Sequence, residues 1–402
     1  MLSTDEALAK ILHESRPKTA AMTPLDQALG LVLAAAAISN VDSPPHEKAL
    51  MDGYALRAAD LAQQPAVLDV QEQITAGELP TLPVGPGQAT RIMTGAPLPP
   101  GVDTVVMVER TTLRTTGGRE QVEINDPTFK PGQNIMPQGL SIRTGDQVLP
   151  AGKRLRPVDI GLLAEAIGRN LLCFPRPQAS VLATGNELTA DDQPAPGQIR
   201  NSNGPMLLAA GEQAGAQMID LGVARDDPES LRTAIARGLE SDVLLLSGGV
   251  SAGVLDLTPS ILRELGVREV FHKVRLKPGK PLWFGVREES GRRTLVFGLP
   301  GNPVSSLVCF ELFARPAIAA IAGLDPTTLP VRHATLGADH AQRSDRPVFW
   351  PGHFDAVSNT ASPLAWKGSA DLRTLSQADC LILFPAGDRT WLPGDEVTIR
   401  PL

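Results

Sequence analysis

The sequence has few cysteines and few aromatic residues. It contains three cysteines in 402 residues, and Phe, Trp and Tyr together make up 4% of the chain. Cys173, Cys309 and Cys380 are far apart, odd in number and set in apolar runs, which is typical of buried free thiols and not of a disulfide framework. We therefore expect a reducing, cytoplasmic environment. The 37 Gly and 36 Pro residues favour a fold with many turns.

The sequence also lacks a long apolar run and an excess of positive charge. No apolar run reaches about 18 residues, and the polar, acidic amino terminus has no basic region followed by an apolar one. We therefore expect neither a membrane span nor a signal peptide. Acidic residues outnumber basic ones by 44 to 37, and this balance provides no general attraction to nucleic acid or anionic lipid.

The length and the apolar periodicity predict several domains. At roughly 100 to 200 residues per domain, the chain has room for two to four. Helical spacing over 3–13 and 24–37, with Ser3 and Thr23 as caps, is followed by short apolar runs and then by helical spacing over 157–167. We therefore expect a discontinuous helical or linker domain, 1–40 and 140–174, interrupted by a β-rich insert, 41–139.

The second half of the chain has a different pattern. Between 175 and 325, continuous apolar strands alternate with amphipathic helices, which predicts a doubly wound, mostly parallel α/β domain. From 326 to 402 the apolar runs become short again, which predicts a small carboxyl-terminal β domain resembling a barrel. The expected fold class is thus α/β plus β-rich domains in one chain.

Three glycine-containing turns directly follow predicted strands of the α/β domain. Such turns meet at the ligand-binding edge of a parallel sheet, and glycine lets backbone N–H groups approach an anion such as phosphate. One such turn alone is more often an ordinary connection, but three at three strand ends favour a site. They are Ala183-Thr184-Gly185-Asn186-Glu187, Ser247-Gly248-Gly249-Val250-Ser251 and Leu299-Pro300-Gly301-Asn302-Pro303.

A basic segment follows the second of these turns. Its alternation predicts a strand that presents Lys273, Arg275 and Lys277 on one face, where they can neutralise an oxyanion. Taken alone, the segment is more typical of a solvated edge strand. Lys280 does not belong to a Walker motif, and the sequence has no dinucleotide-binding glycine motif, zinc-ligand spacing or serine-hydrolase elbow.

Carboxylates also lie near the turns. Glu187, Asp226 and Asp256, with Asp52 from the β-rich insert, are the hard oxygen ligands that Mg²⁺ uses beside substrate phosphates. Each of them singly is equally consistent with a helix cap or a surface acid. Asp227, directly before Pro228, is more typical of a helix N-cap.

Six motifs resemble those of one family. They occur in the family's order over nearly the whole chain, from about Leu2 to Leu402. The chain is therefore similar to the molybdopterin molybdenumtransferases, the MoeA-like proteins that include the carboxyl-terminal domain of gephyrin. Besides the three turns, the motifs are Met51-Asp52-Gly53-Tyr54-Ala55, Arg91-Ile92-Met93-Thr94-Gly95-Ala96-Pro97-Leu98-Pro99 and Lys277-Pro278-Gly279-Lys280-Pro281.

The resemblance implies four domains and an elongated homodimer whose active sites are built by both subunits. It implies insertion of molybdate into adenylylated molybdopterin, with Mg²⁺ and release of AMP, and it implies a molybdopterin adenylyltransferase and an apo-molybdoenzyme as partners. Asp52 and Thr94 would reach the partner's site. The implied catalytic residues are Asp52, Thr94, Asp226, Asp256, Lys273 and Lys277, and the implied metal ligands are Glu187 and Asp256. The implied substrate-binding residues are Thr184, Gly185, Ser247, Gly248, Gly249, Ser251, Pro300, Gly301, Asn302 and Pro303. The implied molybdate-binding residues are Lys280, Pro281, Ser305, Arg346 and Ser369, the last two in the family's variable final domain.

Several positions depart from the family pattern by losing charge. Val254 and Leu257 stand where the family has a carboxylate and a phenol, Asn201 and Gly204 replace one charge of each sign, and Ser141 replaces an acid. These losses leave two alternatives to an active transferase open: a paralogue that binds molybdopterin or a partner as a scaffold, and an enzyme acting on another nucleotide-linked phosphate. Release of AMP would distinguish turnover from binding.

Overall fold

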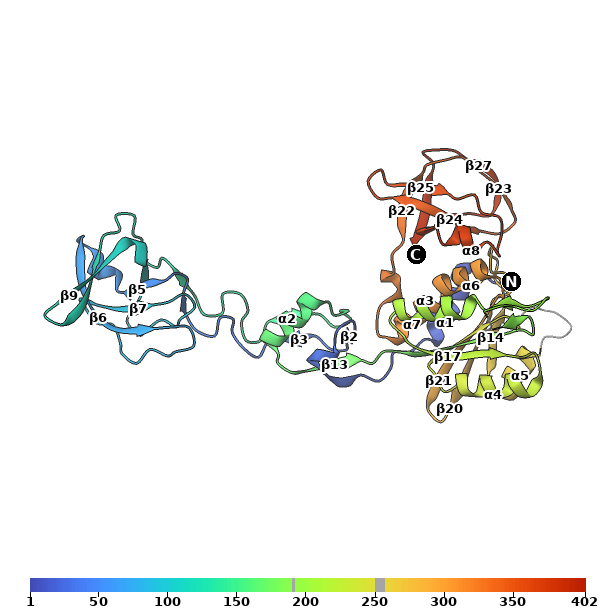
Figure 1. The fold of residues 1–402 in the computed structure, drawn as a ribbon, viewed down its shortest axis with the longest axis horizontal. Helices are drawn as coiled ribbons and strands as arrows, with labels where there is room; N and C mark the ends of the chain where they lie inside the picture. Colours follow the sequence, from blue (N-terminus) through green and yellow to red (C-terminus); the bar gives the residue numbers. More distant parts are fainter. Residues whose placement is uncertain (190–191, 250–256) are drawn as a thin grey trace.

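The chain forms an elongated molecule with a globular unit at each end and a smaller unit between them. The computed structural model describes residues 1–189, 192–249 and 257–402. A β-rich unit lies at one end, a small linker unit lies in the middle, and an α/β unit carrying a barrel lies at the other end (Figure 1). We call residues 21–174, which form the linker and the insert, the arm, and the α/β unit with its barrel the body.

The body is built on a six-stranded sheet, as the alternating pattern predicts. Its first four strands are parallel, and each of the last two, which the sequence analysis did not predict, pairs antiparallel with the strand before it in the sheet. Side chains alternate between two cores: Leu245 faces one and Leu244 and Leu246 face the other, as expected for a sheet covered on both faces. The strand order is β17 (Gln217–Ala224), β14 (Gln178–Thr184), β18 (Val243–Ser247), β21 (Arg292–Leu299), β20 (Trp283–Glu289) and β19 (Arg268–His272).

Helices cover both faces of this sheet (Figure 1). Most of them begin with proline in the first turn, where the missing N–H costs nothing. The expected N-cap of α4 is confirmed, because Asp227 accepts a hydrogen bond from the Ser230 N–H at 2.9 Å. The helices are α3 (Asn203–Gln213), α4 (Pro228–Gly238), α5 (Thr258–Glu264), α6 (Pro303–Cys309) and α7 (Arg315–Ile321), with a π-helical turn over Phe310–Ala314.

The helix expected over 3–13 forms as α1 (Thr4–Glu14). Ser3 and Glu6 make a reciprocal capping box, in which each side chain accepts a hydrogen bond from the other residue's N–H, at 3.1 and 2.8 Å. The helix packs on the body, since Ala7 and Ile11 are buried in its core. It therefore packs with the α/β unit, whereas the sequence analysis placed it with the linker domain.

The helix expected over 24–37 does not form. The chain makes a 3₁₀ turn, Leu25–Gln27, and then reverses at Gly30, whose φ of +77° is a left-handed conformation that ends helical geometry. Short strands follow instead, because strand pairing with a later segment stabilises them more than helix propensity does. They are β2 (Val32–Leu33) and β3 (Ala37–Ile38), with β1 (Ala21–Pro24) before them.

Both sides of the insert contribute to the linker unit. β1 and β2 pair with β13 (Asn170–Phe174), and α2 (Pro157–Ala166) forms where the sequence predicts it. Leu33 from the first side and Leu163 and Cys173 from the second share one core. The exact division of the chain into four domains stays a prediction.

The insert is the β-rich unit that the sequence predicts. Its strands are β5 (Gly53–Leu56), β6 (Ala66–Ile74), β7 (Gln88–Ile92), β8 (Thr104–Met107), β9 (Thr111–Thr116) and β10 (Arg119–Ile124). They form a sheet in the order β8-β5-β7-β6-β10-β9. Asp52 directly precedes β5, and Thr94 follows β7, so both lie on the arm at the end remote from the body (Figure 1).

The carboxyl-terminal segment closes into a barrel, which confirms the small β domain. The barrel strands are β22 (Arg332–Leu336), β25 (Thr360–Pro363), β24 (Val348–Asp355), β26 (Cys380–Phe384) and β28 (Glu396–Pro401). Phe349 and Leu381 extend from the barrel into the core of the α/β unit. The barrel is therefore packed firmly on the α/β unit.

The helical stretch Pro303–Ile321 is long and apolar enough to cross a membrane, with a mean hydropathy of 1.6, although the sequence analysis expected no such segment. Most of it, 83%, is buried inside the protein, which is the environment of a core helix. The three cysteines are free and buried, as expected. Burial raises the pKa of the Cys309 thiol far above its usual value.

Candidate active site

The three glycine-containing turns meet at the carboxyl-terminal edge of the parallel strands. A Cβ atom on Gly248 would lie 2.5 Å from the Thr184 carbonyl oxygen, and one on Gly301 would lie 3.9 Å from the Gly248 Cα. Gly248 and Gly249 both adopt positive φ angles, +91° and +64°. Only glycine allows this close approach of backbone to backbone, so the turns form one surface rich in main-chain groups.

Asn203, at the start of α3, links two of these turns. Its Nδ2 donates hydrogen bonds to the Ser247 Oγ at 2.8 Å and to the Gly301 carbonyl oxygen at 2.7 Å. The sequence analysis missed this role, because an asparagine beginning a helix gives no signal of a long-range contact. The Thr184 Oγ1 and the Asn203 Oδ1 are buried without a hydrogen-bond partner in the described part of the chain. Such atoms are costly unless water or a ligand satisfies them.

A pocket of about 460 Å³ adjoins the turns, between the α/β unit and the barrel. Three cations line it, Lys277, Lys280 and Arg346, and none of the described residues in its lining is a carboxylate. Pro300 and Asn302 of the third turn also line it. The structure thus brings together all five residues for which the resemblance implies molybdate binding: Lys280, Pro281, Ser305, Arg346 and Ser369.

Hydrogen bonds to main-chain oxygens join the α/β unit to the barrel around this pocket. The Lys277 N–H donates to the Pro347 oxygen at 2.9 Å, and the Phe349 N–H donates to the Lys277 oxygen at 2.8 Å. On the other side, the Val304 N–H donates to the Ser369 oxygen at 3.0 Å. The Arg346 guanidinium donates to the Leu276 oxygen at 3.1 Å. These bonds hold the barrel loops against the α/β loops.

The basic segment is not the strand that its alternation predicted. Lys273 has a φ of +74°, and only isolated bridges form, from Val274 to Leu2 and from Lys277 to Val348. Contacts with two different neighbours replace a regular ladder, so the three cations do not share a face. Lys277 lines the pocket, whereas Lys273 does not.

An aromatic wall bounds the pocket on the barrel side, which the sequence analysis did not foresee. Trp350 and Trp366 both line the pocket, with ring centroids 4.9 Å apart and ring planes at 89°. The Trp350 indole N–H donates to the Leu364 oxygen at 2.8 Å, which fixes the ring. An apolar wall limits water on this side and so strengthens the electrostatic attraction of the cations for an anion.

Two of the three expected acids at the turns are described. Asp226 and Asn186 exchange hydrogen bonds at 3.2 Å, which joins the loops after β14 and β17. The Glu187 carboxylate folds over Gly185, where its oxygens lie 2.6 and 2.7 Å from an added Cβ. Asp256 and Ser251 lie outside the described residues. Among the described residues, no group of three metal-ligating side chains occurs, but two carboxylates beside phosphate oxygens and water fit Mg²⁺.

Asp52 and Thr94 form a pair on the arm. The Thr94 N–H and hydroxyl both donate to Asp52 Oδ1, each at 2.7 Å. These hydrogen bonds, the backbone one first, lower the pKa of the Asp52 carboxyl. The pair flanks β5 and β7 of the insert, which lies at the opposite end of the molecule from the α/β unit and the barrel (Figure 1).

The neutralised positions are structurally accommodated. Asn201 Oδ1 accepts a hydrogen bond from the Gly204 N–H at 2.9 Å, and Leu257 packs against a core of the α/β unit. The Ser141 N–H donates to the Ser43 oxygen at 2.9 Å. Val254 lies outside the described residues. Each described substitution therefore has a local partner that does not require charge.

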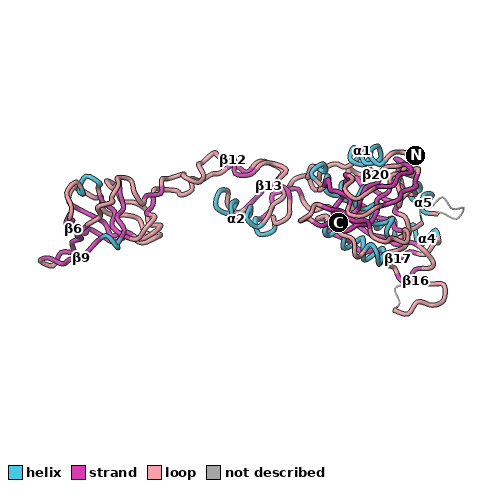
Figure 2. The backbone as a smooth tube through the Cα atoms, turned by 90° about the horizontal axis from the view of Figure 1, so that it is seen from above, coloured by secondary structure: helices cyan, strands magenta, loops and turns pink. Residues whose placement is uncertain are grey.

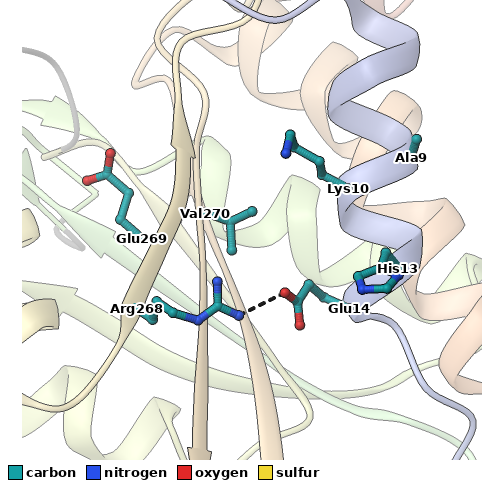
Figure 3. Close-up of a pocket in the computed structure, with 7 residues that line it drawn as sticks. All are labelled: Ala9, Lys10, His13, Glu14, Arg268, Glu269 and Val270. Carbon is teal, nitrogen blue, oxygen red and sulfur yellow. Dashed lines mark hydrogen bonds and ion pairs between the residues drawn. The ribbon is translucent and has the colours of Figure 1, made fainter.

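A second groove of about 460 Å³ lies between α1 and β19 (Figure 3). Lys10 and His13 of the helix and Arg268 and Glu269 of the strand line it, and Arg268 pairs with Glu14 at 2.8 Å. Cations and carboxylates mix in this groove, and none of the expected site residues contributes to it. The cationic pocket is therefore the better candidate for an anion site.

The fold and the site define a class of protein: an α/β domain with a cation-lined pocket beside the glycine turns at the edge of its sheet, extended by a β-rich arm and a barrel. Three family models match the chain in the same order: the MoeA N-terminal region (domain I and II) over residues 2–167, a probable molybdopterin binding domain over 180–320, and the MoeA C-terminal region (domain IV) over 333–402.

Full-length relatives agree with these models. The chain is 34% identical to a molybdopterin molybdenumtransferase from Nostoc sp., covering 93% of this chain and 86% of the relative, and 35% identical to molybdopterin molybdenumtransferase 2 from Mycobacterium tuberculosis, covering 94% and 93%. A molybdopterin biosynthesis MoeA protein from Pyrococcus horikosii superposes with a TM-score of 0.85 at 32% identity, covering 100% and 99%. The chain belongs to the molybdopterin molybdenumtransferase (MoeA) family.

Proposed function

We propose that the protein acts in molybdenum cofactor biosynthesis and inserts molybdate into adenylylated molybdopterin, with release of AMP. The cationic pocket beside the glycine turns is the observation that carries this proposal. Molybdate is a small dianion, and three cations without a carboxylate in the lining suit it. The adjoining backbone surface suits the phosphates of the second substrate.

The side chains act by position and charge. Lys277, Lys280 and Arg346 hold the molybdate, while Gly248 and Gly249 let main-chain groups approach the pyrophosphate. Ser305 and Ser369 offer hydroxyl groups to the same anion. No covalent nucleophile is needed, because bringing two anions together in a fixed orientation and neutralising their repulsion lowers the barrier.

Mg²⁺ completes the proposed site. Glu187 and Asp226, together with Asp256, would hold the ion, which neutralises phosphate charge and orients the leaving group when bound. Neither Glu187 nor Asp226 lines the cationic pocket.

The proposed site is completed by a second subunit. Asp52 and Thr94 flank β5 and β7 of the insert, which lies at the opposite end of the molecule from the α/β unit (Figure 1), and a homodimer would bring the arm of one subunit to the body of the other. Lys273, which does not line the pocket, would act nearer the turns. The three buried free cysteines support a cytoplasmic location, where a molybdopterin adenylyltransferase would supply substrate and an apo-molybdoenzyme would receive product.

A scaffold that binds molybdopterin without turnover is the second candidate. The neutral residues at Asn201, Gly204 and Leu257 favour it, because each replaces a group that the family usually charges or makes polar. The local contacts of Asn201, Gly204 and Leu257 show that the fold tolerates these neutral residues. The scaffold hypothesis therefore rests only on the contacts to ligand that the lost groups would make.

Turnover distinguishes the two functions. Purified protein is incubated with adenylylated molybdopterin and Mg²⁺, and AMP is quantified with and without molybdate. A transferase releases AMP in a molybdate-dependent way, and Lys280→Met reduces the rate while Lys10→Met, on the second groove, does not. Retained substrate without AMP would instead support the scaffold and contradict the transferase.

A further inference from the structure

The arm joins the body through two chain crossings. Residues 15–20 lead from α1 to β1, and residues 175–177 lead from β13 back to β14. The arm extends away from these crossings in both views (Figures 1 and 2). Because the arm is long, a small rotation at the crossings displaces its far end by a large amount.

One carboxylate oxygen links the outgoing crossing to the residue that directly follows the returning crossing. Asp242, directly before β18, accepts a hydrogen bond from Lys18 Nζ at 2.6 Å and another from the Gln178 N–H at 2.8 Å, both at Oδ2. The Asp242 N–H returns a hydrogen bond to the Gln178 oxygen at 2.9 Å. Lys18 belongs to the outgoing crossing. Gln178 is the first residue of β14 and directly follows the returning crossing.

This ion pair is shielded more than most surface pairs. The Lys18 and Asp242 side chains are 26% and 21% exposed, so solvent screens them less than it screens fully exposed charges. Other charged groups nearby have partners of their own: Arg293 pairs with Glu14 at 2.9 Å, and Arg292 donates to the Glu240 oxygen at 3.1 Å. Lys18 is thus the cation that neutralises Asp242.

Uncharged contacts also hold each crossing or its flanking residue to the body without linking the two crossings, among them the 2.7 Å hydrogen bond from the Gln217 N–H to the Pro177 oxygen. The Lys18 N–H donates to the Ile321 oxygen at 3.0 Å, at the end of α7. The Phe174 ring covers Gly323, where an added Cβ would lie 2.1 Å from the ring. Each contact holds one crossing to the body. Among the described residues, the side chain of Asp242 is the one that contacts both the outgoing crossing and the residue directly after the returning one.

We propose that Asp242 is a positioning residue that sets the direction of the arm, and thereby places Asp52 and Thr94 in the partner's site. The expected effect of Asp242 on activity rests on the proposed function. Its expected effect on the direction of the arm does not. Removing the negative charge should leave the pocket intact, since neither Asp242 nor Lys18 lines it. Loss of the ion pair therefore affects turnover and not molybdate affinity.

The direction of the arm is measured first. The native cysteines are buried, so spin labels attach selectively at Thr233→Cys in α4 and Val158→Cys in α2, both exposed positions. Labelled chains are diluted with unlabelled protein to isolate distances within one subunit. We expect a narrow distance distribution for the parent and for Lys18→Arg, and a broader one for Asp242→Asn and Lys18→Met, with no further broadening when both changes combine.

The control breaks an ion pair elsewhere on the body. Glu264→Gln removes the 2.7 Å pair with Arg232 between α5 and α4, remote from the crossings, and should leave the distribution unchanged. Thermal unfolding of all variants checks that they fold. A distribution in Asp242→Asn as narrow as that of the parent would overturn the proposal.

Activity is measured next on the same variants. We expect kcat for AMP release to fall at least about tenfold in Asp242→Asn, since a misplacement of about 1 Å can cost about 100-fold, while the molybdate Kd stays unchanged. A broadened arm with unchanged kcat would refute the positioning role. Absence of molybdate-dependent turnover in the parent would refute the proposed function instead, and the distance measurement would still decide whether Asp242 directs the arm.

Discussion

Replacing Lys280 with methionine should weaken molybdate binding without disturbing the fold. Lys280 lines the cationic pocket, and its side chain is exposed. Its backbone oxygen accepts a hydrogen bond from the Val274 N–H at 3.0 Å, a bond that the substitution retains. Methionine keeps most of the length of the side chain and removes only the charge.

The magnitude follows from the position of the cation. Two unit charges 4 Å apart attract by about 1 kcal/mol in water, so a dianion gains about 2 kcal/mol from one exposed ammonium group. That free energy corresponds to a roughly 30-fold rise in Kd. Lys277 and Arg346 remain in the pocket, so binding should be weakened but not abolished.

Isothermal titration calorimetry with molybdate measures this effect. Lys10→Met is the matched control, because Lys10 is also exposed but lies on the second groove (Figure 3). The difference between the two variants should shrink as ionic strength rises, because salt screens an exposed charge. A Kd for Lys280→Met within about threefold of the parent value at low salt would refute a direct electrostatic role.

Three further substitutions test other parts of the site. Gly248→Ala should lower the free energy of unfolding by about 2–4 kcal/mol in urea titrations, because the new Cβ would clash with the Thr184 oxygen and the φ of residue 248 is positive. An unchanged urea midpoint would contradict the close packing of the turns. Asn203→Leu should cost about 1–3 kcal/mol and weaken pterin binding, because two hydrogen bonds to the turns are lost; unimpaired binding in a fluorescence titration would oppose this. Thr94→Val should raise the pKa of Asp52 toward its usual value, seen by carboxyl NMR, because the hydroxyl donor is lost while the backbone donor stays. Since the folded-state pKa of Asp52 is lowered, its contribution to stability is present above the unfolded-state pKa and is lost as pH falls through the folded-state pKa. A stability difference between the parent and Thr94→Val that persists in acid would show that the difference does not come from the ionised Asp52 carboxylate.

Local patterns predicted most of the body. The helix caps at Ser3 and Asp227 and the apolar strands of the α/β domain, such as β18, form where the sequence indicates them. Glycine turns after parallel strands must gather at one edge, so the meeting of Gly248 and Gly301 also followed from the pattern. These features depend on short-range chemistry or on a general rule of sheet topology.

Contacts between distant segments were not predictable in the same way. The residues over 24–37 are spaced for a helix, but pairing with β13 and the reversal at Gly30 give strands. The alternating cations from Lys273 to Lys277 look like a strand, yet bridges to Leu2 and Val348 divide the segment. Asn203 carries no local signal for its bonds. In each case a partner more than 40 residues away decides the conformation.

The most direct test of the transferase measures AMP and molybdenum-bound pterin in one reaction. Purified protein, adenylylated molybdopterin, Mg²⁺ and molybdate are combined, and molybdate is omitted from the control. Molybdate insertion predicts that both products rise together in equal amounts and that neither forms in the control. AMP released at the same rate without molybdate, or pterin bound tightly with no AMP released, would contradict it.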